Sequence, residues 1–276
     1  MRGFVAAVLI ALGLLLVPLA NLGVWTQREV LSTSGFSSLA TDVLERDEVR
    51  AALSNRIADE LVARVPQLSA GRIILVPVLE QVIGSDQFAA IFEHAVADMH
   101  GQLEGGADQL TLNLDAMLPL VKQLVANVDS GLASRIPTQT GLAGITVVTK
   151  DNVPQLWLGV DIARGASWLF PALALIFLVL GVAVANNRGL TLVIAGLGLA
   201  TISLLIVVAL KAGRGPLSNV AGPDVEVSAF NAGYDVVTKS LVVQTAVLGV
   251  LGLVAALIGI VISARRRSKP EPVVWA

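Results

Sequence analysis

The chain has 276 residues, of which 55% are hydrophobic and only 14% are charged. A typical soluble domain has about 25% charged residues, so part of this chain is expected to face lipid. The sequence contains no cysteine, which excludes disulfide bonds, zinc–thiolate sites, thiol nucleophiles and iron–sulfur clusters.

Four apolar stretches without a charged side chain are long enough to cross a membrane as helices, because about 20 residues rising 1.5 Å each cover a bilayer core of about 30 Å. They are residues 4–24, 168–185, 190–210 and 241–263. The first stretch follows Arg2 like a signal peptide, but it lacks a small-x-small cleavage site. We therefore interpret residues 1–25 as an N-terminal transmembrane anchor, and residues 167–264 as a three-span bundle.

Flanking basic residues suggest the orientation. If both termini are cytoplasmic, the basic residues inside are Arg2, Arg188, Arg265, Arg266, Arg267 and Lys269. Those near the membrane outside are Arg28, Arg164, Lys211, Arg214 and Lys239. This bias is small, so the prediction of cytoplasmic termini rests more on the signal-like first segment and the basic cytoplasmic tail, residues 265–276.

The stretch between the first two spans is predicted to be an extracytoplasmic domain. Residues 26–166 carry ten Lys/Arg and seventeen Asp/Glu, a net charge of −7. Apolar residues recur every four positions from Val49 to Val65, which predicts a helix capped by Asp47. A later helix is predicted to begin after a cap at Ser85 and to end at Gly105.

The second half of this domain has a minor β signature. Residues 110–114 alternate in polarity, and residues 145–149 are mostly β-branched, which predicts two strands. A helix between them is expected to turn side chains as far as Val128 inward. The order strand–helix–strand would permit a parallel pair with a right-handed crossover. Asn152, shortly before a proline, predicts a further helix.

The outer loop, residues 211–240, is predicted to have two parts. Residues 211–223 contain three glycines and two prolines, which predicts a flexible segment. Asp224 could then cap a helix carrying Phe230 and Tyr234 on one side. That apolar face could pack under the acidic domain or lie in the lipid interface, and the sequence leaves both open.

Several segments together resemble a family of actinobacterial integral membrane proteins of unknown function. The segments are Asn21–Trp25, Val49–Leu53, Asp59–Leu61, Phe88–His100, Thr111–Leu114, Arg135–Pro137 and Ile145–Val147. The resemblance implies a shared architecture over most of the chain, with one N-terminal span, an extracytoplasmic helical domain and three further spans. It supplies no catalytic residues to carry over.

Residues able to perform chemistry are few. His94 and His100 are six positions apart, which places them about 120° apart on a helix instead of on one face. We expect His94 to pair with Asp98 and His100 with Glu104. No HExxH, GxSxG or phosphate-loop motif occurs. We therefore expect no catalytic, cofactor-binding or metal-binding residues and no cofactor.

The last span carries an ordered stripe of small residues. Its members are Gly249, Gly252, Ala256, Gly259 and Ser263, spaced alternately three and four apart. A shorter stripe on the third span comprises Gly196, Ala200 and Ser203. Small residues let helices approach closely in lipid, so we interpret the first stripe as a helix-packing face. Whether it packs within the chain or against a second copy is left open.

The predicted fold class is mainly α: a four-span transmembrane protein with an inserted extracytoplasmic helical domain carrying a two-strand β element. We interpret the chain as a non-catalytic, multi-pass cell-membrane protein whose outer domain binds an unknown protein or envelope partner, or senses the envelope. A homo-oligomer is possible, and no nucleic acid is expected. Alternatives are a channel or transporter subunit, disfavoured by spans without charges, and an envelope enzyme acting on a lipid or wall precursor, disfavoured by the absence of a catalytic constellation.

Overall fold

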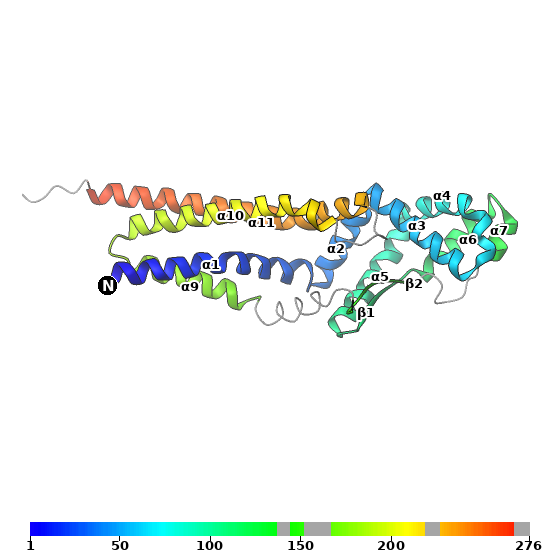
Figure 1. Cartoon of the computed structure of the whole chain (residues 1–276), viewed down its shortest axis with the longest axis horizontal. Helices are drawn as coiled ribbons and strands as arrows, with labels where there is room; N and C mark the ends of the chain where they lie inside the picture. The colour runs from blue at the N-terminus through cyan, green and yellow to red at the C-terminus, as the bar shows by residue number, and fades with distance from the viewer. Residues whose placement is uncertain (137–143, 152–166, 219–226, 268–276) are drawn as a thin grey trace, which may run out of the picture. The chain divides into compact units, whose positions relative to one another are not determined.

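The computed structural model describes residues 1–136, 144–151, 167–218 and 227–267, and it is mainly helical (Figure 1). The chain divides into two compact units. The first comprises residues 1–27, 162–213 and 238–276, and the second comprises residues 28–161 and 214–237. The predicted helix starting at Asn152 lies outside the described residues.

The first unit consists of apolar helices. They are α1 (Arg2–Glu29), α9 (Leu169–Val184), α10 (Arg188–Ser218) and α11 (Val227–Arg267), of which the last residues of α10 and the first of α11 belong to the second unit. Among the residues that the structure describes, three helices, α1, α10 and α11, are long and apolar enough to cross a membrane, whereas α9 is a shorter apolar helix of 16 residues. Many large apolar side chains on all four are exposed, as lipid-facing side chains would be.

Helices α1 and α9 pack antiparallel, and a glycine on each helix receives a side chain from the other. A methyl group added to Gly13 would lie 2.8 Å from Cγ of Leu178, and one added to Gly181 would lie 2.7 Å from Cδ1 of Ile10. Both distances are too short for two carbon atoms. The two helices therefore approach closely only because these positions lack a side chain.

The second unit contains shorter helices and two strands. Its elements are α2 (Thr33–Leu44), α3 (Asp47–Arg64), η1 (Pro66–Gly71), α4 (Arg72–Ile83), α5 (Asp86–Glu104), β1 (Gln109–Asn113), η2 (Asp115–Met117), α6 (Leu118–Ala126), α7 (Ser130–Arg135) and β2 (Gly144–Thr149). Their apolar side chains pack into one core, in which Ile57, Leu61, Leu79, Phe88 and Leu118 are almost fully buried. The paired helices η1–α4 and α5 are also apolar enough to pass as a bent span, but they contribute much of this core.

Helix ends in this unit follow local capping chemistry, with one correction. Ser85 caps α5, because its Oγ accepts a hydrogen bond from the Phe88 amide at 3.2 Å, and Gly105 ends that helix. Asp47 does not cap α3: the cap residue is Arg46, and Asp47 is the first helical residue, ion-paired with Arg50. A carboxylate in the first turn still interacts favourably with the helix dipole.

Two expectations for the second half of the unit were wrong. Strands β1 and β2 pair antiparallel, with a bulge between Leu110 and Thr111, so no parallel crossover exists between them. Helix α6 ends at Ala126, and Val128 is 64% exposed instead of facing inward. The Gln102 side chain from α5 hydrogen-bonds both the N–H and the C=O of Thr111, and so occupies that edge of β1.

The outer loop is more ordered than predicted. Residues 211–218 continue α10 as a helix despite Pro216, and the proposed cap Asp224 lies outside the described residues. Arg214 forms an ion pair with Asp235 at 3.2 Å and hydrogen-bonds Asn231. The first turns of α11 belong to the second unit, where Gly233 lies beside Val43 of α2. Of the two alternatives that the sequence left open, this contact supports packing of the start of α11 against the domain.

Candidate functional site

The small-residue stripe of α11 lies against α10, and the ribbons of the two helices run side by side (Figure 1). An added methyl group at Gly252 would lie 2.6 Å from the carbonyl oxygen of Gly196, and one at Gly259 would lie 2.6 Å from that of Gly189. Ala256 is 4% exposed, and its backbone faces Gly196. The backbones meet almost directly along this contact, which we call the α10–α11 seam.

At each end of the seam, a serine on one helix lies against a glycine on the other. A methyl group added to Gly249 would lie 3.2 Å from Cβ of Ser203, and one added to Gly189 would clash with Oγ of Ser263. All five residues singled out on α11 thus lie on the side that faces α10. On α10, the shorter stripe of Gly196, Ala200 and Ser203 continues to Gly189, two turns before Gly196, which the sequence analysis did not include.

A second contact of α11, with α1, is polar. Asn21 is 4% exposed, and its Nδ2 donates to Oγ1 of the fully buried Thr245 at 2.8 Å. Nε2 of Gln244 donates to both the backbone oxygen and Oδ1 of Asn21, at 2.8 and 2.9 Å. Thr245 in turn donates to the Leu241 carbonyl at 2.7 Å. These bonds form a chain with a fixed donor–acceptor direction, which we call the polar clasp.

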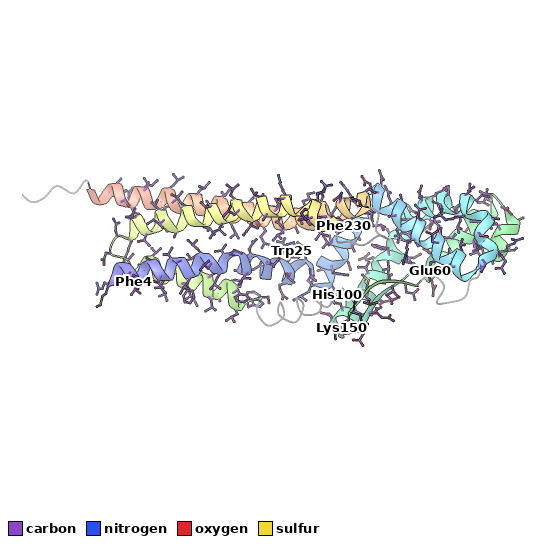
Figure 2. All side chains as sticks on the ribbon, viewed as in Figure 1. Phe4, Trp25, Glu60, His100, Lys150 and Phe230 are labelled. Atoms are coloured by element: carbon purple, nitrogen blue, oxygen red, sulfur yellow. The ribbon has the colours of Figure 1, made fainter. Side chains whose placement is uncertain are left out.

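The clasp continues toward the end of α1. Nε1 of Trp25 donates to Oγ of Ser240 at 2.8 Å, and Trp25 is labelled in Figure 2. Asn21 lies in the first apolar stretch of the sequence, and Gln244 and Thr245 lie in the last. Their partnership joins residues more than 220 positions apart, so no local spacing could reveal it.

The two histidines of α5 differ in environment. His100 is 1% exposed; its Nε2 lies 3.0 Å from the Val30 carbonyl oxygen and its Nδ1 3.3 Å from Oγ1 of Thr33 (Figure 2). Because a carbonyl can only accept, Nε2 carries a hydrogen. Glu104 is 4.0 Å from Nδ1, at the limit of an ion pair. His100 therefore joins α5 to the start of α2 through these two hydrogen bonds.

His94 is exposed on the same helix, and within the described residues no ion pair joins it to Asp98. Nor does any group of three His, Asp or Glu side chains in the described parts of the chain come close enough to hold a metal ion. The small and polar residues described above pack α11 against α10 and α1, and His100 joins α5 to the start of α2.

Comparison with family models, curated proteins and solved structures gives no match. The resemblance to an actinobacterial membrane family therefore stays a prediction.

Proposed function

We propose that the chain is a four-span protein of the cell membrane whose outer domain, residues 26–166, binds an envelope partner or senses the state of the envelope. Both termini are cytoplasmic in this proposal. The observation that carries it is the contrast between four helices with exposed apolar side chains and a separate unit with its own apolar core.

Packing of α9 supports a fourth span. At 16 residues it covers about 24 Å, slightly less than a bilayer core of about 30 Å. It runs antiparallel to α1 between two glycine contacts, and Gly23 near the end of α1 lies beside Ser167, just ahead of α9. A helix packed along this length of a spanning helix crosses most of the same apolar layer.

A binding or sensing role fits the polar groups of the outer domain. The ion pair of Arg72 with Asp59 at 2.9 Å holds α4 to α3, and that of Asp47 with Arg50 lies within α3, so these charges serve the helices instead of a reaction centre. His100 is occupied by backbone and hydroxyl partners. These engagements favour a folded recognition domain over an envelope enzyme.

Topology is testable because the natural chain has no cysteine. Ser69, exposed in η1, and Ser268 are each replaced by cysteine and treated with an impermeant maleimide in intact cells. We expect labelling of Ser69→Cys at once and of Ser268→Cys only after the membrane is permeabilised. Labelling of Ser268→Cys alone in intact cells would contradict the proposed orientation. Ser54 is unsuitable because it is fully buried.

A further inference from the structure

Two polar atoms near the polar clasp have no partner among the described residues. They are Oε1 of Gln244 and Oγ of Ser203, and both are shielded from solvent. Ser203 itself is 3% exposed. Buried polar groups in an apolar surrounding are normally hydrogen-bonded, so each of these atoms calls for a donor or an acceptor.

Three helices bring these atoms to one level of the first unit. Thr245 and Gly249 are one turn apart on the same face of α11. Asn21 of α1 bonds to Thr245, and Ser203 of α10 lies against Gly249. Gln244 precedes Thr245 and bonds to Asn21 as well. We call Asn21, Ser203, Gln244 and Thr245 the polar layer.

Contacts within the layer leave the two atoms unsatisfied. Thr245 shows the usual solution for a hydroxyl in an apolar helix, donation to the carbonyl one turn earlier, but Ser203 makes no such bond. Rotating the Gln244 amide by half a turn would place Oε1 against two oxygens of Asn21 and break two bonds. The acceptor at Oε1 therefore stays open whenever the clasp is closed.

We propose that the polar layer binds water. Water can donate to Gln244 Oε1, which only accepts, and can donate to or accept from Ser203 Oγ, so it fits both open atoms. A cation is less suitable, because the layer contains no carboxylate and two of its four side-chain oxygens, Asn21 Oδ1 and Thr245 Oγ1, already accept hydrogen bonds. The membrane unit thus contains a hydrated site between α1, α10 and α11.

The test uses single cysteines in the full-length protein in membrane vesicles. Ser203→Cys is compared with Val17→Cys; Val17 is 6% exposed and lies one turn from Asn21 on α1. Vesicles are treated with Ag⁺, an ion small enough to follow water, and the remaining thiols are counted with a fluorescent maleimide after denaturation. Thiols react as thiolates, which form in water and not in an apolar core.

We expect Ser203→Cys to react about tenfold faster than Val17→Cys, because only the first thiol meets water that supports its ionisation. Adding Gln244→Leu, which removes the open acceptor, is expected to slow the Ser203→Cys reaction severalfold. Equal rates for Ser203→Cys and Val17→Cys would overturn the proposal. A Ser203→Cys rate unaffected by Gln244→Leu would overturn it too, because water would then reach the serine independently of the layer.

Discussion

The two units of the chain use apolar residues in opposite ways. In the second unit, side chains such as Phe88 and Leu79 point inward and fill a core, as the hydrophobic effect in water requires. In the first unit, large apolar side chains point outward, and the helices touch through glycine, alanine and serine. Burying an apolar side chain gains little free energy when its surroundings are already apolar. Close backbone contacts and hydrogen bonds therefore stabilise the packing of these helices.

The largest expected effect comes from truncating a large side chain in the apolar core of the second unit. Phe88 is fully buried and stacked on Phe92 with ring centroids 5.9 Å apart. Phe88→Ala should lower the unfolding free energy of the second unit by about 3–5 kcal/mol, through lost burial and a residual cavity. Hydrogen exchange of core amides in the full-length protein measures this.

The matched control for that change is Ile73→Ala, because Ile73 is 88% exposed in the same unit. Its exchange rates should stay close to those of the natural chain. A loss of core protection as large as that of Phe88→Ala would show that Ile73 is covered, and the contrast between inward and outward side chains would fail for this unit.

Next in size is overfilling the α10–α11 seam. Ala256→Leu places a branched side chain where Ala256 meets the backbone of Gly196, and should lower the unfolding free energy in detergent by about 1–3 kcal/mol. Leu257→Ala, one residue further and 62% exposed, should have a smaller effect. An unchanged midpoint for Ala256→Leu would mean that this face is not a tight contact.

The smallest expected effect is loss of the polar clasp. Hydrogen bonds between membrane helices contribute about 0.6 kcal/mol on average and at most about 1.7 kcal/mol. Asn21→Leu should therefore cost about that amount, and Gln244→Leu should cost less in the Asn21→Leu background than alone, because the two bond each other. Strictly additive costs in a double-mutant cycle would show that the clasp does not hold α1 to α11.

Local features of the fold were predictable from the sequence. The Ser85 cap, the helix stop at Gly105 and the stripe beginning at Gly249 each depend on residues within one or two turns. Their chemistry is therefore complete in a short stretch of chain.

Non-local features were not predictable. The direction of the β1–β2 pair depends on segments outside either strand. Residues 211–218 are helical although they contain two glycines and a proline, which usually interrupt a helix. The polar layer was missed for a similar reason. Ser203 was read as a small residue for packing, and its hydroxyl became informative only once Gly249 and Gln244 were placed beside it.

The two contacts of α11 also imply an order of assembly during synthesis. The α10–α11 seam joins consecutive helices, so this hairpin can close as soon as α11 has been synthesised. The polar clasp joins α11 to α1, with Asn21 and Thr245 separated by 224 positions. Asn21 therefore has no partner in the clasp until α11 has been translated. We expect the clasp to form late in folding, because Gln244 and Thr245 are synthesised after α9 and α10.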